Sequence, residues 1–407
     1  MCSSDLILKL KPATKDYLWG GHRLADEYGV DFDGPVLAEA WELSCHPDGP
    51  STIVNGAFAG KTLKQYIDEQ GFDVLGKNCA RFREFPILTK FIDAKENLSI
   101  QVHPDNAYAL KNENQYGKTE MWYIIDAEPG AFLYYGFTHE ISKEEFEERI
   151  KNNTLLEVLN AVPVHKGDAF LIKAGTLHAI GKGILIAEIQ QNSNVTYRIY
   201  DYGRIGKDGK PRDLHIQQSL DVTKREPVQP DTEGYPHIFD TDYFTVDKLN
   251  LDGKVTKEMQ GHVDDASFLS VLILDGQGVI SSGNDRIGYG KGDSFFLPAD
   301  SGDWKIEGSC DALLTTIRAK ENPIVAHLSF AEGKIDLVDE NQAVLASKEV
   351  ADSDCKTVGQ AVMDFFVEKD IPIEQVVDVK VSLQEGMDAN QSLAELKEVI
   401  PCPVHIG

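Results

Sequence analysis

The stretch KGDAFLIKAGTLH, residues 166–178, decides the fold, because it occurs again as KGDSFFLPADSGD at residues 291–303. In each copy a Gly-Asp pair leads into a short apolar run of the length of a β-strand. A repeat of this kind indicates two related β units in one chain. The first copy ends with Gly175 and His178, whereas the second copy has aspartates in the corresponding places. Only the first unit therefore offers a histidine here.

Strand-like sequence extends on both sides of the repeat. From Leu6 to about Arg318, short runs of β-branched and aromatic residues are separated by Gly, Asp and Pro, which predicts a mainly β chain. Helical signals are few. The clearest begins at Ser142, which can cap a helix while Glu145 completes a capping box, and a shorter one begins near Thr62. We expect a mainly β fold with a short helical insert.

The first copy of the repeat resembles the second motif of the cupin family, Gly-x5-Pro-x-Gly-x2-His. In cupins this motif closes a hairpin and presents a metal-binding histidine inside a jelly-roll β-barrel. Here Gly167, Gly175 and His178 match the motif and Lys173 takes the place of the proline. The second copy keeps the proline, Pro298, but lacks the histidine. The resemblance implies two cupin-type barrels, of which only the first has metal ligands.

The pattern changes after about Pro323. Residues 334–339 and 344–346 are strand-like, and residues 357–368 place apolar side chains along one face of a helix. The polar link at residues 319–323 contains a proline and marks a boundary. We expect three domains: a metal-binding β unit at residues 1–232, a second β unit without metal ligands at residues 233–320, and a small α/β appendage at residues 321–407.

Length and composition exclude several classes of protein. A chain of 407 residues is too long for one ordinary core. Its net charge of −26 repels nucleic-acid phosphates and anionic lipids, and no stretch approaches the ~20 apolar residues of a membrane span. We expect no nucleic-acid or membrane partner. We expect a cytoplasmic location. The cysteines lack Cys-x-x-Cys spacing, which favours reduced thiols without metal. The oligomeric state is not determined by the sequence.

Candidate metal ligands lie on strands of the first unit. In LSIQVH, residues 98–103, alternation places Ser99, Gln101 and His103 on one face. Glu120 begins another strand-like run. With His178 these residues supply two imidazoles and one carboxylate, which suit Zn²⁺ or another divalent first-row metal. Gln101 could add a carbonyl oxygen. Either histidine alone is explained as well by an interior hydrogen bond, but together they favour a metal site.

Six runs in the first half of the chain resemble the type I mannose-6-phosphate isomerases, in the order expected of that family. The runs are WGG (19–21), EAWELS (39–44), FPILTKF (85–91), LSIQVHP (98–104), GKTEMW (117–122) and the segment from Glu188 through Asn194 to Arg198. The resemblance implies a metal-dependent aldose–ketose isomerase of the compact bacterial form. Such an enzyme interconverts mannose 6-phosphate and fructose 6-phosphate by proton transfer through an enediol(ate).

The resemblance also implies the roles of individual residues. One zinc ion per chain would be bound by His103, Glu120 and His178, with Gln101 as a further ligand. Arg198 would be an active-site arginine and Glu188 an acid/base candidate.

A sugar phosphate needs a local cationic pocket in so acidic a chain. Lys118 and Arg198 can supply positive charge near the sugar oxygens, and Ser99 and Arg204 are candidates for binding the phosphate. Arg204 takes the place of a lysine that family members often carry. It lies between Gly203 and Gly206, so a solvated turn explains it equally well.

Two other functions fit part of this pattern. A non-catalytic cupin could bind a sugar phosphate through its metal and use the appendage for docking. A cupin oxygenase could use the two histidines and the carboxylate to hold Fe(II). The coincidence of the ligand set with Lys118, Glu188 and Arg198 favours the isomerase, because a binding module needs no proton-transferring group.

The appendage resembles the first lobe of the repressor, open-reading-frame and kinase family of sugar kinases. That lobe begins with an Asp-x-Gly-Gly-Thr phosphate loop, and the corresponding stretch here is HLSFAEGK, residues 327–334. Bulk and negative charge replace the glycine-rich turn that would admit a phosphate. We expect the appendage to serve packing or self-association. An unrelated α/β appendage explains the sequence nearly as well.

Overall fold

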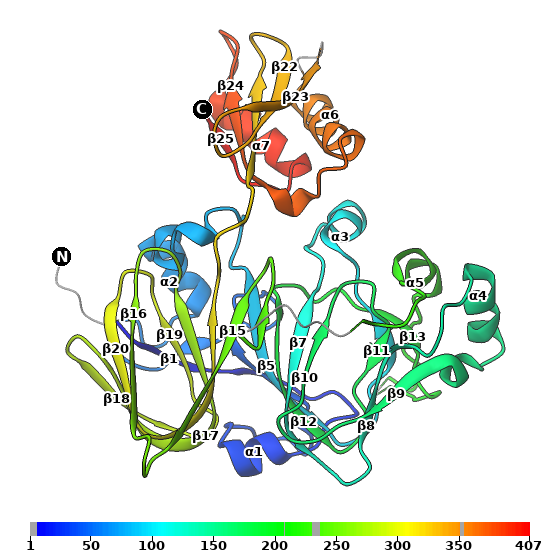
Figure 1. Ribbon diagram of the computed structural model, residues 1–407, viewed down its shortest axis with the longest axis vertical. Helices are drawn as coiled ribbons and strands as arrows, with labels where there is room; N and C mark the ends of the chain where they lie inside the picture. The colour runs from blue at the N-terminus through cyan, green and yellow to red at the C-terminus, as the bar shows by residue number, and fades with distance from the viewer. Residues whose placement is uncertain (1–5, 207, 230–236, 351–353) are drawn as a thin grey trace.

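The computed structural model describes residues 6–206, 208–229, 237–350 and 354–407. Two β units lie side by side, and the carboxy-terminal appendage stands above them in Figure 1. The domain boundary expected between residues 232 and 233 falls outside the described residues, as does Cys2. The five described cysteines are free and buried.

The first β unit consists of two antiparallel sheets whose apolar faces pack together. Trp122 and Ile186 of the larger sheet share a buried cluster with Leu133 of the smaller one. The larger sheet has the order β10 (Ala169–Ile172), β7 (Glu120–Ala127), β12 (Ile184–Gln191), β5 (Ile87–Ala94), β3 (Glu39–Leu43), β2 (Ala13–Lys15). The smaller sheet has the order β13 (Tyr197–Tyr200), β6 (Ile100–Val102), β11 (His178–Ala179), β8 (Phe132–Phe137), β9 (Leu159–Pro163).

Strand β12 is buried along its whole length because both of its faces are covered. Ile184 and Ile186 point between the two sheets of the first unit. Leu185 and Ala187 pack instead into the cluster that this unit shares with the second. Alternation along the strand therefore turns Glu188 toward the interior of the first unit.

The second β unit is a single nine-stranded sheet with its own buried core. Strand β17 shifts register against β20 between Ile273 and Asp275, and a bulge of this kind usually bends a strand. The sheet has the order β14 (Phe239–Asp240), β15 (Thr245–Asp252), β20 (Gly302–Thr316), β17 (Leu269–Ser282), β19 (Ser294–Leu297), β1 (Leu8–Lys11), β4 (Thr52–Ile53), with β16 (Glu258–Val263) beside β20 and β18 (Asp285–Gly290) beside β17.

The prediction of a mainly β fold is confirmed, but its barrel form is not. In the part of the chain that the structure describes, the strand orders are open, so no sheet closes into a barrel. Strands β1 and β4 also come from the start of the chain, yet they pair within the sheet of the second unit. Leu8 lies opposite Phe296, and Leu10 lies opposite Ile53.

The two copies of the repeat occupy equivalent places. The amide of Gly167 donates to the carbonyl of Ile124, and the amide of Ile124 donates to the carbonyl of Asp168. In the second copy Gly292 and Asp293 form the same pair of bonds with Ile273. Both glycines have positive φ, 93° and 89°, which explains why the turn requires glycine.

The appendage has its own core and its own five-stranded sheet, so its α/β character is as expected. The helix expected at residues 357–368 begins slightly earlier, where Asp354 caps it by accepting from the amide of Thr357. The sheet has the order β23 (Val344–Glu349), β22 (Lys334–Val338), β21 (Ile324–Ser329), β24 (Val376–Ser382), β25 (Val404–Ile406), and the helices are α6 (Cys355–Glu368) and α7 (Ala389–Val399).

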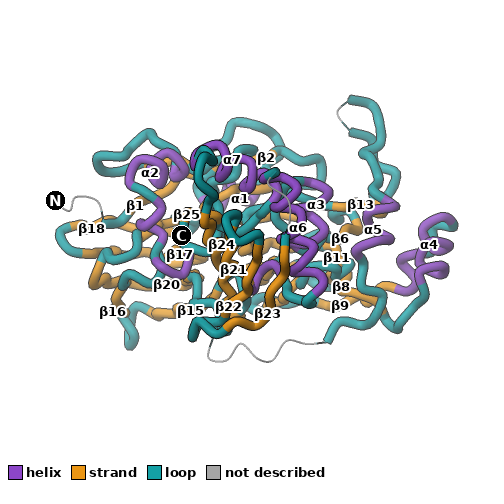
Figure 2. The backbone as a smooth tube through the Cα atoms, turned by 90° about the horizontal axis from the view of Figure 1, so that it is seen from above, coloured by secondary structure: helices purple, strands orange, loops and turns teal. Residues whose placement is uncertain are grey.

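The remaining helices connect strands of the two β units, except η4, which precedes β24 in the appendage. Viewed from above, α4 and α5 lie at one end of the molecule and β16 and β18 at the other (Figure 2). None of the described helices combines the length and apolar content needed to cross a membrane. The helices other than α6 and α7 are α1 (Arg23–Tyr28), α2 (Leu63–Gln70), α3 (Asn106–Glu113), α4 (Lys143–Lys151), α5 (Ile216–Val222) and the 3₁₀ turns η1 (Phe72–Leu75), η2 (Lys77–Cys79), η3 (Leu155–Val158), η4 (Ile373–Gln375).

Candidate metal centre and active-site cavity

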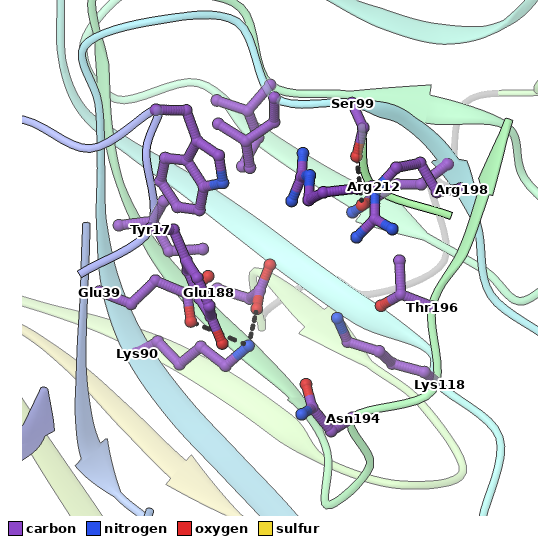
Figure 3. A pocket seen from close by; sticks show the side chains of 15 residues that line it. Tyr17, Glu39, Lys90, Ser99, Lys118, Glu188, Asn194, Thr196, Arg198 and Arg212 are labelled. Atoms are coloured by element: carbon purple, nitrogen blue, oxygen red, sulfur yellow. Dashed lines mark hydrogen bonds and ion pairs between the residues drawn. The ribbon is translucent and has the colours of Figure 1, made fainter. Parts of the chain in front are cut away.

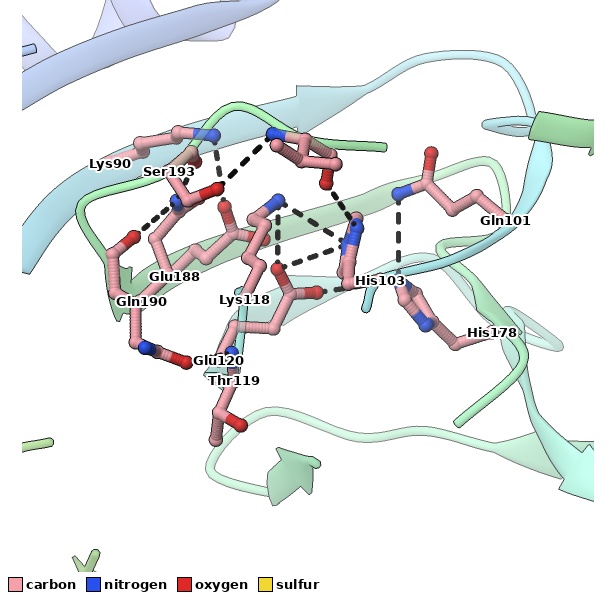
Figure 4. Close-up of polar contacts among 12 residues, drawn as sticks. Lys90, Gln101, His103, Lys118, Thr119, Glu120, His178, Glu188, Gln190 and Ser193 are labelled. Atoms are coloured by element: carbon pink, nitrogen blue, oxygen red, sulfur yellow. Dashed lines mark hydrogen bonds and ion pairs between the residues drawn. The ribbon is translucent and has the colours of Figure 1, made fainter. Parts of the chain in front are cut away.

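Three of the expected metal ligands meet inside the first β unit. His103 follows β6, Glu120 begins β7 and His178 begins β11, and one ligand atom from each lies within 4.8 Å of the others. All three side chains are buried. Figure 4 shows both imidazoles turned toward the carboxylate of Glu120. The nearest nitrogen–oxygen distances from Glu120 are 3.4 Å to each histidine.

Backbone carbonyls fix which nitrogen of each histidine faces the cluster. Nδ1–H of His103 donates to the carbonyl of Val195 at 3.0 Å, and Nδ1–H of His178 donates to that of Thr176 at 2.8 Å. Each Nε2 is left with a lone pair that points at the shared space. This outer support is typical of histidines that bind metals.

The charge state of the cluster suits a cation. Burial, followed by the charge of Lys118, lowers the pKa of His103 to about 3, and burial lowers the pKa of His178. Burial opposes ionisation of Glu120, but the positive charge of Lys118 at 2.9 Å holds its pKa well below the usual value. Two neutral imidazoles and one carboxylate therefore face each other, which is the protonation state that metal binding requires.

Gln101 borders the same cluster. Its Nε2 lies 3.5 Å from Nε2 of His178, and its Oε1 accepts a hydrogen bond from the hydroxyl of Ser99. A half-turn of the amide would present Oε1 to the cluster in place of Nε2. The four residues together fit a divalent cation, because neither buried oxygen of Glu120 has a hydrogen-bond partner among the described residues apart from the ion pair with Lys118.

A cavity of about 250 Å³ lies next to the cluster. Figure 3 shows side chains that line it. Gln101 and Lys118 line this cavity and also contact members of the cluster, so they connect the two. Ser99, Glu188 and Arg198 line it as well. The other lining residues are Tyr17, Trp19, Glu39, Lys90, Ile92, Leu98, Ile180, Asn194, Thr196 and Arg212.

Glu188 is a buried carboxylate on the cavity wall. It forms an ion pair with Nζ of Lys90 at 3.1 Å and accepts a hydrogen bond from Nε1 of Trp122 at 2.9 Å. Burial in the first place, and then the negative charge of Glu120, raise the pKa of Glu188, while Lys90 and Lys118 oppose the rise. The side chain is thus held in one position, with a pKa shifted in the direction that a proton-transferring carboxylate needs.

Arg198 and Arg204 have different surroundings. Arg198 extends from β13 into the cavity wall, where its Nη1 donates to the carbonyl of Asp213 at 3.0 Å. Arg204 pairs with Asp201 and donates to the carbonyl of Asn97. It lines a neighbouring cavity of about 330 Å³ and is not among the residues that line the first one.

Two family profiles match this chain. "Phosphomannose isomerase type I, catalytic domain" matches residues 7–128, and "Mannose-6-phosphate isomerase, cupin domain" matches residues 236–317. A mannose-6-phosphate isomerase of Streptococcus mutans serotype c is 39% identical over 305 residues, which are 73% of this chain and 93% of the relative. The chain belongs to the type I phosphomannose isomerases.

Two further comparisons define the part that this type I phosphomannose isomerase shares with relatives. The mannose-6-phosphate isomerase ManA of Bacillus subtilis is 37% identical over 319 residues, which are 76% of this chain and 98% of the relative. The crystal structure of the mannose 6-phosphate isomerase from Bacillus subtilis matches with a TM-score of 0.69 at 36% identity, covering 76% of this chain and 99% of the other. Both family profiles end before the appendage begins at β21.

Sequence reasoning missed several residues of the phosphomannose isomerase cavity. Lys90 and Glu39 lie in runs that signalled the family, and alternation along β5 and β3 could have pointed to them. Arg212 carried no such signal, because it lies in a loop between β13 and α5. Its Nε and Nη2 donate to the two oxygens of Asp201 at 2.8 and 2.7 Å.

Proposed function

We propose that this chain interconverts mannose 6-phosphate and fructose 6-phosphate in the 250 Å³ cavity, with one Zn²⁺ bound by His103, Glu120, His178 and Gln101. One observation supports this most directly. A buried ligand cluster of neutral imidazoles and a carboxylate borders a cavity whose wall carries a buried carboxylate, Glu188, and several cations. Membership of the type I phosphomannose isomerases supports the isomerase activity.

The metal would act as a Lewis acid on the sugar oxygens at carbons 1 and 2. Imidazole and carboxylate ligands suit zinc, and a fourth ligand from Gln101 leaves room for substrate only if the coordination number expands or Gln101 gives way. Ser99 donates its hydroxyl hydrogen to Gln101 and so influences which atom of the amide faces the cluster.

The reaction moves a proton between carbon 2 and carbon 1 through an enediol(ate), while the oxygens exchange a second proton. We assign the carbon-bound proton to Glu188, which would accept it from one carbon and return it to the other. Lys90 and Trp122 hold both carboxylate oxygens of Glu188 in place. A carboxylate with a raised pKa is a stronger base at neutral pH than an ordinary one.

Cations on the wall would stabilise the negative charge of the enediolate and bind the phosphate. Lys118 lies against the ligand cluster, so we assign it to the sugar oxygens together with Arg198. Ser99 and Arg212 also line the cavity, and we assign them to the phosphate. The hydroxyl hydrogen of Ser99 becomes free for this bond once Oε1 of Gln101 turns to the metal. Arg204 then supports Arg212 indirectly, since both arginines bind Asp201.

The test is a coupled assay of mannose 6-phosphate conversion by the purified protein, with and without a chelator and added Zn²⁺. We expect the chelator to abolish turnover and Zn²⁺ to restore it. His178→Ala should neither bind zinc tightly nor turn over, and Glu188→Gln should bind zinc but lose turnover. Undiminished turnover in metal-free protein would refute the metal role. Tight sugar-phosphate binding without any turnover would favour the non-catalytic function.

A further inference from the structure

The appendage contacts the segment of chain that carries Lys118. The phenolic hydroxyl of Tyr116 donates a hydrogen bond to the carbonyl of Pro401 at 3.0 Å. Pro401 is buried and lies between α7 and β25 of the appendage. Tyr116 lies only two residues before Lys118 and four before Glu120. Figure 1 shows α3, which begins the same segment, beside the appendage.

The backbone of Tyr116 is connected to His103 by a chain of hydrogen bonds. The carbonyl of Tyr116 accepts a hydrogen bond from the hydroxyl of Ser193 at 2.8 Å, and that hydroxyl accepts one from the amide of Val195 at 3.3 Å. The carbonyl of Val195 in turn accepts from Nδ1–H of His103. Tyr116 therefore connects the appendage to two proposed metal ligands, to His103 through hydrogen bonds and to Glu120 along the chain.

The residues after Tyr116 are held equally firmly. The amide of Gly117 donates to the side chain of Asn106 at 2.8 Å, and the amide of Lys118 donates to the carbonyl of Pro104 at 3.0 Å. A shift of Tyr116 would have to be absorbed by these bonds or passed on to Lys118. Satisfied buried hydrogen-bond networks of this kind are rigid, so each member has little freedom to adapt.

We propose that Tyr116 is a positioning residue through which the appendage holds Lys118 and His103 in place. The appendage lies outside the matched family profiles, yet its contact is with the segment nearest the chemistry. We call this contact, from Pro401 of the appendage to Tyr116, the brace of the metal centre, because it restricts the movement of the segment that carries Lys118. The effect on turnover rests on the proposed isomerase activity, whereas the effect on metal retention rests only on the proposed metal site.

A matched pair of variants tests this in the full-length protein. Tyr116→Phe removes the bond to Pro401, and Tyr243→Phe removes another hydroxyl bond to the appendage, from Tyr243 to Glu374 at 3.0 Å. Tyr243 belongs to the second β unit and does not line the 250 Å³ cavity. Both changes keep the aromatic ring, and thermal unfolding shows whether both variants are folded.

For Tyr116→Phe we expect zinc to pass to a chromogenic chelator about three to ten times faster than from the parent protein, as the loss of one hydrogen bond allows. We expect kcat to fall by a similar factor with little change in KM, because Lys118 is assigned to the reacting oxygens and not to the phosphate. Tyr243→Phe should match the parent protein in both measurements.

Equal zinc release and equal kcat in the two variants would overturn the proposal. Equal acceleration of zinc release in both would also overturn it, because a general loosening of the appendage would then be the cause. Faster release from Tyr116→Phe alone, in a protein that does not convert mannose 6-phosphate, would support the brace and refute the proposed function.

Discussion

Asp201 holds two arginines, and only one of them borders the cavity. Arg212 and Arg204 both pair with this buried carboxylate and both line the neighbouring cavity of about 330 Å³. Arg204 also donates to the carbonyl of Asn97, and only Arg212 lines the 250 Å³ cavity. The pair with Asp201 uses two of the five N–H groups of Arg212. A carboxylate behind a guanidinium fixes its orientation, so Arg212 presents charge to a ligand at little cost in conformational entropy.

This arrangement distinguishes the two arginines experimentally. Arg212→Ala should raise KM for mannose 6-phosphate about tenfold or more, because a charge-assisted bond to phosphate contributes on the order of 1.5–3 kcal/mol. Arg204→Ala should raise KM less, since it removes only a support for Asp201. Steady-state kinetics of both variants decide the matter, and a larger effect from Arg204→Ala would reverse the assignment.

Glu42 is a buried carboxyl group with no evident role in the reaction. Neither of its oxygens has a hydrogen-bond partner among the described residues, and it does not line the cavity. Burial, and then the charge of Asp293, raise its pKa well above the usual value. The folded protein thus binds this proton more tightly than the unfolded chain does.

The free energy of unfolding should therefore fall as the pH rises from about 4.5 toward the folded pKa of Glu42. Glu42→Gln removes this titration. We expect the variant to lose less stability than the parent between pH 5 and pH 8, measured by urea unfolding at both values. Parallel losses in the two proteins would show that Glu42 is not the source.

At the residue scale, strand alternation determined what could be predicted. Gln101 and His103 share a face of one strand-like run, and Glu120 and His178 stand at strand starts marked by family-like motifs. Arg212 could not be found in this way, because a loop has no periodicity that reveals which side chain faces a cavity.

At the element scale, helices with a cap and an apolar stripe were predictable and others were not. Ser142 caps α4 by accepting from the amide of Glu145, as the sequence indicates. Helix α3 escaped prediction because its eight residues bury only Asn106 and Ala109. Its start depends on Asp105, which accepts from the amide of Tyr108 directly after a proline that ends a strand. The cap and the two buried residues stabilise this helix, and no amphipathic pattern marks it in the sequence.

The cap of α4 can be tested without touching the cavity. Ser142→Ala should lower the free energy of unfolding by about 1 kcal/mol, because the amide of Glu145 loses its acceptor. Ser142→Asp keeps a cap and should restore most of the loss. Urea unfolding measures both, and turnover should stay at the parent level since α4 contributes no residue to the cavity.

At the scale of the whole molecule, the repeat predicted two β units, but not the origin of every strand. The partners Leu8 and Phe296 are far apart in sequence, and β1 and β4 are too short to reveal their sheet by pattern alone. The open sheets likewise depend on where long strands bend, which the apolar runs do not specify. The appendage was expected from the change in composition and periodicity after Pro323, and β21 begins at Ile324.

We expected residues 327–334 to take the place of a kinase phosphate loop that has lost its glycine-rich turn. Phe330 is buried in the core of the appendage. The amide of Glu332 donates a hydrogen bond to the hydroxyl of Ser329 and is therefore not free to bind a phosphate. We therefore expect no ATP-dependent phosphorylation of mannose or other hexoses by the purified protein. An ADP-release assay with and without sugar checks this, and sugar-dependent ADP formation would contradict it.

The placement of β1 also constrains how the protein forms during synthesis. Strand β1, residues 8–11, leaves the ribosome early. Its neighbour β19 ends at Leu297, so one edge of β1 has no partner strand until most of the polypeptide has been made. An unoccupied strand edge invites pairing with other nascent chains. The alternating sequence LKLK counters this hazard, because Lys9 and Lys11 discourage such pairing until Asp293 arrives as the ion-pair partner of Lys9.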